Sequence, residues 1–384
     1  MNCLPNRFNL LAVCLLASAA GYAQPEPATL PPFPPTPPER IVAAYALTPS
    51  PADPLAAQEG TQERTELHRR LIKSYAVTPS DVLTIDNHFG DVTVSHWDRN
   101  EMRVEVVITS SSENAERARR ALEGVTINED HKDNAHGFKT HIAEAFSGGW
   151  KKGDRTNFLR VDYRIAMPRA NGLTIRNKFG NVNIPDFSAP LAVESQFGNI
   201  YGAAMTNPAT TINASFGNVS IRDVQNGKVK MEFGDLDISS GNVLTIVQNY
   251  GKLRIGETNR VDVNMSYADA IIGAIRQSGK LNMNYTKQFR LDQLPASADQ
   301  LEVNAKFSSV ALPVQTQTHC DFDITVTNGG FTYPTLPNLH LISQPGSAQA
   351  APRAGRRQQY VGRVGDGDGP RIRVVSVFGD VKFK

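Results

Sequence analysis

The stretch Phe179-Gly180-Asn181-Val182-Asn183-Ile184 decides the fold, because related stretches recur along the chain. Four copies follow at spacings of 18, 19, 17 and 17 residues, one lies upstream, one closes the chain, and three looser ones start at Tyr267, Tyr285 and Phe307. Repeats of this length predict stacked structural units. The corner residues of the clear copies are Phe89, Gly90, Phe179, Gly180, Asn181, Phe197, Gly198, Asn199, Phe216, Gly217, Asn218, Phe233, Gly234, Asp235, Tyr250, Gly251, Phe378 and Gly379.

The residues before each aromatic alternate between apolar and polar. The fourth position before it is aliphatic in all ten copies, and the position directly before it is polar in nine. This alternation predicts a strand with one buried face. The second position before the aromatic is uncharged, and we expect its polar members, such as Asn87 and Asn177, to pair with each other inside the protein.

The residues after the aromatic predict a turn. Glycine follows it in seven of ten copies, and we expect this glycine to supply a positive φ. Asn or Asp comes next in seven copies, and both residues tolerate left-handed geometry and bond their own backbone in turns. Apolar residues such as Val182 and Ile184 then return. Each unit is therefore predicted to be strand, corner, strand and polar loop.

These patterns predict an all-β fold: a parallel β-helix, or β-solenoid, of roughly ten short coils, with one short helix near the N-terminal end. Coils stacked about 4.8 Å apart bury one continuous core and pair their backbones. An antiparallel β-sandwich is the alternative. The constant motif in constant register favours the solenoid, because a sandwich has no reason to repeat its side-chain columns.

The first 69 residues are predicted to stand apart from the folded domain. Arg7, the apolar run Leu10–Ala20 and the small residues before a cleavage site after Ala23 predict a signal peptide over residues 1–23. Residues 24–69 are a Pro-rich tether and charged linker, since residues 24–55 hold 11 of the 24 prolines. This tract is also a possible polyproline ligand for a partner.

Residues 70–384 are predicted to form the β-solenoid domain. Ser110 and Glu113 form a capping box that predicts a helix over 110–124, ended by Gly124. Residues 56–75 are charged and are expected to form a short helix. Residues 128–157 are expected to be a polar loop, and 335–370 a flexible excursion. The final segment, Arg371–Lys384, returns to the repeat and is expected to dock on the sheet.

Composition limits the classes of partner. Lys and Arg total 40 against 38 Asp and Glu, so neither nucleic acid nor an anionic membrane surface is expected as the main partner. No stretch after the signal peptide is apolar enough to span a membrane. Loss of the signal peptide removes Cys3 and Cys14, so the mature chain keeps Cys320 and no internal disulfide; we expect this residue to be buried.

Two groups of residues carry side chains of the types used in catalysis or metal binding. The corner column Asn218, Asp235, Lys252 and Asp269 alternates acid with lysine, which suits charge compensation better than Ca²⁺ binding or acid–base catalysis. The second group, His131, Asp133, His136 and His141, lies in the predicted polar loop and is either solvated or a transition-metal site. We therefore predict no catalytic residue, no metal and no cofactor.

Three segments carry a resemblance to a known family. They are Leu83–Val92, with Leu83-Thr84-Ile85-Asp86-Asn87-His88-Phe89-Gly90-Asp91-Val92, then Leu173–Val182 and Ile372–Val381. Residues 70–384 resemble the exported bacterial putative-adhesin domains, which are built from β-strand repeats. The resemblance implies a β-helix-like fold and a cell-envelope location, and it brings no catalytic residues.

The expected function is therefore that of a non-catalytic, exported cell-envelope scaffold with an adhesin-like binding role. The partner is unknown, with a protein or a glycan on the cell surface as the expected class. Exposed columns could form its binding face. The alternatives are a polysaccharide-active β-helix enzyme and an envelope sensing or signalling partner. Periplasm, outer surface and secretion all remain open. The exposed columns that could form the binding face run through Lys178, Gln196, Glu232, Asn249 and Lys306.

Overall fold

The computed structural model describes residues 64–144, 158–315, 317–343 and 357–384, all within one unit, Thr61–Lys384. The predicted signal peptide, residues 24–63 of the tether, and residues 145–157 and 344–356 lie outside this part. The elements are β1 (Thr65–Ala76), β2 (Val82–His88), β3 (Val92–His96), β4 (Glu101–Ser112), α1 (Ala115–Glu123), β5 (Val125–Lys132), β6 (Ala135–Ile142), β7 (Phe158–Met167), β8 (Gly172–Lys178), β9 (Val182–Ile184), β10 (Leu191–Gln196), β11 (Ile200–Met205), β12 (Thr210–Ser215), β13 (Val219–Glu232), β14 (Leu236–Asn284), β15 (Phe289–Gln293), β16 (Gln300–Lys306), β17 (Val310–Leu312), β18 (Cys320–Thr327), β19 (Phe331–Thr332), β20 (Leu339–Ser343), β21 (Arg357–Val364), β22 (Arg371–Val377) and β23 (Val381–Phe383).

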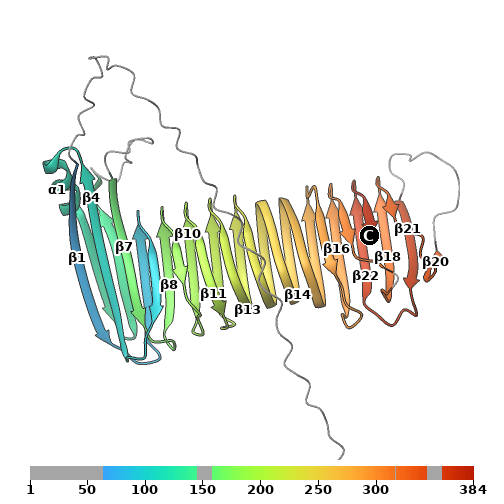
Figure 1. Cartoon of the computed structure of the whole chain (residues 1–384), viewed down its shortest axis with the longest axis horizontal. Coiled ribbons are helices and arrows are strands. Elements are labelled where there is room, and N and C mark those ends of the chain that lie inside the picture. The colour runs from blue at the N-terminus through green and yellow to red at the C-terminus, as the bar shows by residue number, and fades with distance from the viewer. Residues whose placement is uncertain (1–63, 145–157, 316, 344–356) are drawn as a thin grey trace, which may run out of the picture. The chain divides into compact units, whose positions relative to one another are not determined.

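The described part is all-β with a single helix. Its 23 strands form one open, mixed sheet, and Figure 1 shows neighbouring strands lying side by side. The strands that precede the aromatic corners pair with one another, and so do the strands that follow them. These pairings are parallel from β2 to β17, and antiparallel pairs appear near the two ends of the series.

The parallel strands pair in register, at equal positions of the sequence repeat. Ile175 of β8 lies opposite Ile85 of β2 and Val193 of β10. Further along, Val303 of β16 lies opposite Leu281 and Val374. These aliphatic side chains are at most 2% exposed and belong to one continuous core. Like residues therefore align along the core, as the alternating columns predict.

The end of the chain does not occupy the end of the sheet. Strand β22 lies between β16 and β18, and β23 lies between β17 and β19. Arg371–Lys384 thus completes a unit that is enclosed by units earlier in the sequence. The docking of this segment was predicted from its apolar residues, but its position between two other units was not.

Antiparallel strands occur where the parallel series stops. Strand β4 lies between β1 and β7, β5 pairs with β6, and β21 lies between β18 and β20. The predicted helix within residues 56–75 is wrong for its described part, because β1 begins at Thr65. Leu71 and Tyr75 pack on the core from one face of β1, and the charged residues of that same face are paired, since Lys73 lies 3.0 Å from Glu129 and Arg69 donates to the carbonyl oxygen of Val125.

The predicted helix exists but begins later than expected. Ser110–Ser112 belong to β4 and are buried, so the proposed capping box is wrong. Asn114 is the N-cap, and its side-chain oxygen accepts from the backbone N–H of Arg117 at 3.0 Å. Helix α1 ends before Gly124, and it contacts β1, β4 and β5.

Two segments expected to be irregular contain antiparallel strands. Within the predicted loop 128–157, residues 128–142 belong to the β5–β6 hairpin. Within the predicted excursion 335–370, β20 and β21 extend the sheet beyond β18. The strands escaped detection because most side chains of β5 and β20 are exposed or only half-buried, which removes the apolar alternation that marks a strand.

Candidate functional site

The repeated aromatic residues form one continuous stack, here called the aromatic ladder. Neighbouring ring centroids are 4.7–5.1 Å apart, and neighbouring ring planes differ by 1–8°. The spacing matches the distance between adjacent strands of a sheet. The ladder consists of Phe89, Phe179, Phe197, Phe216, Phe233, Tyr250, Tyr267, Tyr285, Phe307 and Phe378.

All ten aromatic residues have left-handed backbone geometry, with φ between 49° and 64°. This geometry costs a residue with a side chain about 1–2 kcal/mol. Stacked aromatic pairs contribute about 0.5–1.5 kcal/mol each, and each interior ring makes two such pairs. Each pair is shared between two rings, so ring stacking offsets part of the backbone strain along the ladder.

The prediction that the corner glycines supply the positive φ is wrong. The aromatic residue supplies the positive φ, and among the corner glycines only Gly251 has one. At the other positions glycine is required by close approach, because a Cβ on Gly217 would overlap the carbonyl oxygen of Gly198 in the neighbouring unit. The same overlap with the neighbouring carbonyl occurs at Gly90, Gly180, Gly198, Gly234, Gly251 and Gly379.

The corner Asn and Asp residues also act between units. The side-chain oxygen of Asn199 accepts from the backbone N–H of Asn218 at 2.9 Å, and that of Asn218 accepts from Asp235 at 3.1 Å. Asp235 in turn accepts from Lys252 at 3.0 Å. The prediction that these side chains bond their own turn is therefore wrong. Asp91, Asn181, Asp269 and Asp380 make the same kind of bond.

The ladder presents ring edges to solvent. Nine of its rings are 44–50% exposed, but the faces of interior rings contact neighbouring rings. A sugar ring stacks on an exposed aromatic face, so the interior of the ladder offers no such platform. It offers an apolar ridge, to which the tyrosines Tyr250, Tyr267 and Tyr285 add hydroxyl groups.

Beside these tyrosines lies a groove of about 560 Å³ on the outer surface of β14, β16 and β22. Polar side chains from two columns line it, together with the half-buried Val247, Val375 and Val377, and Lys306 is the one charged residue among them. We call it the amide groove. Its polar, uncharged residues are Asn249, Asn264, Ser266, Asn282, Asn284 and Asn304.

One column of the amide groove is a hydrogen-bonded ladder. Asn282 donates to the side-chain oxygen of Asn264 at 2.9 Å, and Asn304 donates to that of Asn282 at 3.2 Å. Asn249, Ser266 and Asn284, in the second column, make no side-chain hydrogen bond within the described residues. Their amide and hydroxyl groups are free to bind a ligand.

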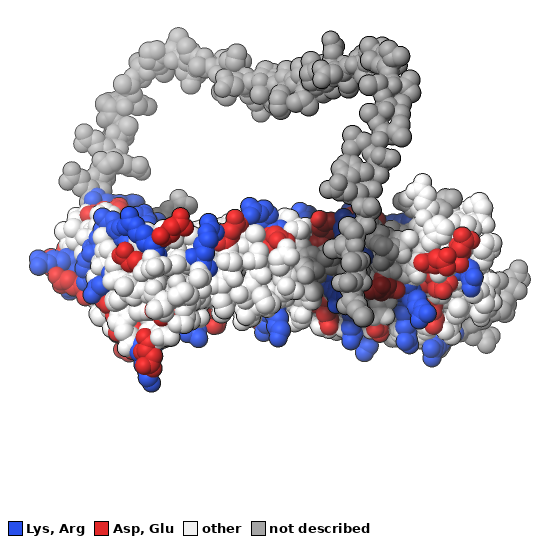
Figure 2. Space-filling model, turned by 90° about the horizontal axis from the view of Figure 1, so that it is seen from below, with Lys and Arg blue, Asp and Glu red and all other residues white. Residues whose placement is uncertain are grey.

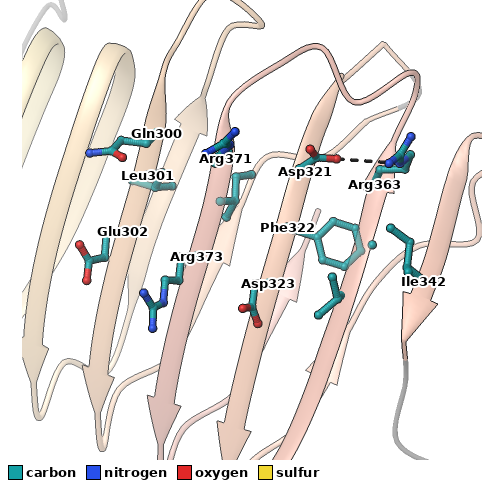
Figure 3. A pocket seen from close by; sticks show the side chains of 13 residues that line it. Gln300, Leu301, Glu302, Asp321, Phe322, Asp323, Ile342, Arg363, Arg371 and Arg373 are labelled. Atoms are coloured by element: carbon teal, nitrogen blue, oxygen red, sulfur yellow. Dashed lines mark ion pairs between the residues drawn. The ribbon is translucent and has the colours of Figure 1, made fainter.

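A second pocket, of about 440 Å³, lies near the C-terminal end of the sheet (Figure 3). Arg373 of β22 lies between Glu302 and Asp323 of the two neighbouring strands, and Arg371 lies opposite Asp321, which pairs with Arg363 at 3.9 Å. Acidic and basic side chains alternate across this pocket. The arrangement balances its own charge and selects neither an anionic nor a cationic ligand.

Charges of both signs also occur on the face shown in Figure 2, where basic and acidic side chains are interspersed. On the strands after the corners, a smaller pocket is lined by Asp235, Asp237, Lys252, Arg254 and Asp269, and Arg254 pairs with Asp237 at 3.5 Å. The amide groove differs from both charged pockets in its chemistry.

The β5–β6 hairpin brings together two of the four residues that the sequence assigns either to a solvated loop or to a metal site. His131 and His136 lie opposite each other, with their Nδ1 atoms 3.2 Å apart, whereas Asp133 is in the turn and His141 lies further along β6. Tyr75 donates to Glu129 at 2.6 Å. No group of three or more metal-ligating side chains occurs among the described residues.

The environment of this hairpin shifts two pKa values. Burial, together with the hydrogen bond to Glu129, raises the pKa of Tyr75. Burial opposes ionisation of Glu129, but hydrogen bonds from Tyr75 and Lys73 outweigh it and hold the pKa of Glu129 below its usual value. These side chains satisfy one another, and we assign them to packing of β1 against the hairpin.

Cys320 is fully buried in β18, and burial raises its pKa to about 12. The neighbouring charge of Asp321 acts in the same direction. The thiol is therefore not activated as a nucleophile. Its burial agrees with the expectation from the sequence.

The five exposed column residues named from the sequence do not form one site. Asn249 and Lys306 line the amide groove, whereas Lys178, Gln196 and Glu232 lie outside it. Sequence analysis missed the groove itself. A signal was present, since three consecutive copies replace Phe by Tyr and carry Asn, Ser and Asn directly before it.

No protein-family model and no curated protein matches the chain. Solved structures to which it is similar include a putative cell adhesion protein from Clostridium sporogenes, with 12% identity over 83% of this chain and 99% of that one and a TM-score of 0.23. Another is a putative adhesin from Bacteroides fragilis, with 13% identity, 59% and 95% coverage, and a TM-score of 0.31. A putative lipid binding protein from Parabacteroides distasonis has 11% identity, 82% and 97% coverage, and a TM-score of 0.30. Similarity at this level defines neither a family nor a function for this chain.

No helix in the described residues has the length and apolar character needed to cross a membrane.

Proposed function

We propose that the protein is a non-catalytic, exported cell-envelope scaffold that binds an extended partner, in the manner of an adhesin. The observation that carries this proposal is the amide groove, whose free polar groups recur from unit to unit along the sheet. A regular array of this kind suits a long ligand that contacts several units at once.

The architecture that we propose is a parallel β-solenoid. In-register pairing of β8, β10, β12 and the strands that follow supports it, as does the unbroken aromatic ladder. Strand β14 also supports it, because this single strand of 49 residues continues through the two corners at Tyr250 and Tyr267. The antiparallel strands would then cover the ends of the stack, where unpaired backbone N–H and C=O groups could otherwise pair with a strand of another chain.

The bonding of the corner column supports a binding role over catalysis. Asp235 and Asp269, the carboxylates considered for Ca²⁺ or acid–base chemistry, accept backbone N–H groups of Lys252 and Gln288. Each thus has a structural task in joining neighbouring units. Export rests on the predicted signal peptide of residues 1–23, which fits a partner on the cell surface.

A binding screen with the full-length chain tests the proposal. We expect saturable binding to a glycan or to an envelope protein on a glycan array and in a pull-down from envelope extract, without chemical change of the ligand. Depolymerisation of a polysaccharide, measured with and without Ca²⁺, would replace the proposal with the enzyme alternative. Stoichiometric co-purification of one membrane protein would instead favour the sensing alternative.

A further inference from the structure

We infer that the amide groove binds an extended, uncharged polysaccharide strand. This inference rests on the proposed binding function and names its ligand class. The first argument is the coincidence of two substitutions in the repeat. All three units with tyrosine in the ladder carry an uncharged amide or hydroxyl residue directly before it, in Asn249, Ser266 and Asn284, whereas only two of the seven units with phenylalanine do, in Gln196 and Ser215.

Packing alone does not explain this coincidence. The seven other units keep Phe in the ladder with the same stacking distances, so a hydroxyl group is not needed for the stack. The tyrosines are 44–50% exposed, and their hydroxyl groups make no hydrogen bond within the described part. The substitutions therefore add donors and acceptors at the surface without adding an internal contact.

The hydrogen-bonding capacity of the groove matches hydroxyl groups. Asn249 and Asn284 each keep two N–H donors and one carbonyl acceptor, and Ser266 keeps its hydroxyl. Asn282 uses one N–H on Asn264 and keeps the other. Sugar hydroxyl groups both donate and accept, so one ligand type can satisfy amides and hydroxyls together.

The charge of the groove selects against ionic ligands. Lys306 is its one charged lining residue, and it lies at the Phe307 end of the series rather than among the tyrosines. The tyrosine units line the groove with the uncharged residues Asn249, Ser266 and Asn284, so an ionic ligand lying there would find no charge of opposite sign. Burying a charge without a partner is costly, so an uncharged chain fits the groove better.

The repeat of the groove points to a polymer. Equivalent side chains recur at the strand spacing of about 4.8 Å, which is comparable with the length of one sugar residue in an extended β-linked chain. Successive sugars could then meet equivalent groups on successive units. Such a strand would lie along the groove by hydrogen bonding, because the interior ring faces of the ladder are covered.

Calorimetric titration of the full-length chain tests this inference. The neutral probes are cellohexaose, laminarihexaose and β-mannohexaose, and hexagalacturonate is the charged control of equal length. We expect at least one neutral hexamer to bind and hexagalacturonate to bind at least tenfold more weakly. The double variant Asn282→Ala/Asn284→Ala should weaken neutral binding at least tenfold, and Tyr267→Phe should weaken it a few-fold.

Asn213→Ala is the matched control, because Asn213 is exposed in the same column as Asn282 but belongs to the Phe216 unit, outside the groove. It should change binding less than twofold. Circular dichroism melting shows whether each variant is folded. Failure of all neutral hexamers to bind, or equal binding by the double variant and the control, overturns the inference. A protein partner recovered by the full-length chain despite that result would leave the proposed scaffold function standing.

Discussion

The side-chain N–H of Asn87 donates to the side-chain oxygen of Asn177 at 3.0 Å, although 90 residues separate them. Both residues are at most 1% exposed. The side-chain oxygen of Asn87 also accepts from the Thr140 hydroxyl at 3.0 Å, which lies 2.9 Å from the hydroxyl of Tyr163. One buried network therefore joins β2, β6, β7 and β8.

This network predicts a large effect of Asn87→Ala on stability. The substitution removes the donor to the buried side-chain oxygen of Asn177 and to the carbonyl oxygen of Val161, and an unsatisfied buried group costs about 1–3 kcal/mol. We expect the free energy of unfolding to fall by about 3 kcal/mol in a urea titration. Asn213→Ala, at an exposed position, should change it by less than about 0.5 kcal/mol. Equal effects of both substitutions would show that the network adds no stability.

The glycine column predicts that Gly217→Ala is poorly tolerated. A Cβ would overlap the carbonyl oxygen of Gly198, and Gly234 continues the column on the other side, so neither strand can move away freely. We expect a loss of about 4 kcal/mol or more, measured by thermal and urea unfolding. Gly330→Ala is the control, because its Cβ would meet only Asp380 Oδ1 at 3.4 Å. A stable Gly217→Ala variant would contradict the close packing of the corners.

The sequence predicted correctly which residues of neighbouring units lie opposite each other. It predicted the corner residues too, but not the structural role that each of them has. The aliphatic residues Ile85, Ile175 and Val193 fixed the alignment, because a slip of one residue would expose the whole apolar column. The glycine requirement was predicted with the wrong cause. A close approach between Gly217 and Gly198 depends on a neighbouring unit, and local turn propensity cannot reveal it.

Other features depend on contacts distant in sequence. The position of β22 between β16 and β18 depends on the path of the chain and not on its apolar pattern. Val374 would fit equally well at the end of the apolar column. His131 and His136 meet only because residues 128–142 form a hairpin, and its exposed strands lack a clear alternation. The amide groove likewise combines residues of β14, β16 and β22.

The left-handed geometry of the ladder predicts an unusual order of substitutions at Phe216. Both Phe216→Gly and Phe216→Ala lose stacking on Phe197 and Phe233, at 4.9 Å on each side. Glycine adopts φ near 56° without strain, whereas alanine does not. We expect the glycine variant to be more stable than the alanine variant by about 1 kcal/mol.

Urea unfolding of both Phe216 variants gives this comparison directly. In ordinary strands alanine is favoured over glycine by about 0.5–1 kcal/mol, so the expected order is reversed at this position. Thr211, on the preceding strand, provides a control for the usual order. A higher stability of Phe216→Ala than of Phe216→Gly would mean that the corner relaxes to a right-handed geometry once the ring is removed.

The contact between β1 and β4 predicts a pH-dependent contribution to stability. Arg70 donates to Glu105 at 2.9 Å, and Arg164 lies 3.6 Å from the same carboxylate. The hydrogen bond from Arg70 holds the pKa of Glu105 below its usual value of 4.5. A carboxylate with a lowered folded-state pKa stabilises the protein above that usual value, and its contribution is lost as the pH falls through the folded-state pKa.

The variant Glu105→Gln should therefore be less stable than the native chain at pH 7, and the difference should shrink as the pH falls from 5 to 3. We expect a difference of at most about 1 kcal/mol at pH 7, because Arg70 is largely exposed and solvent screens the pair. Urea unfolding at each pH measures it. Glu123→Gln, which disrupts an exposed ion pair with Arg119 on α1, is the comparison and should have a smaller effect at pH 7. A difference at Glu105 that grows on acidification would contradict the lowered pKa, because the native chain alone carries the titrating carboxylate at this position.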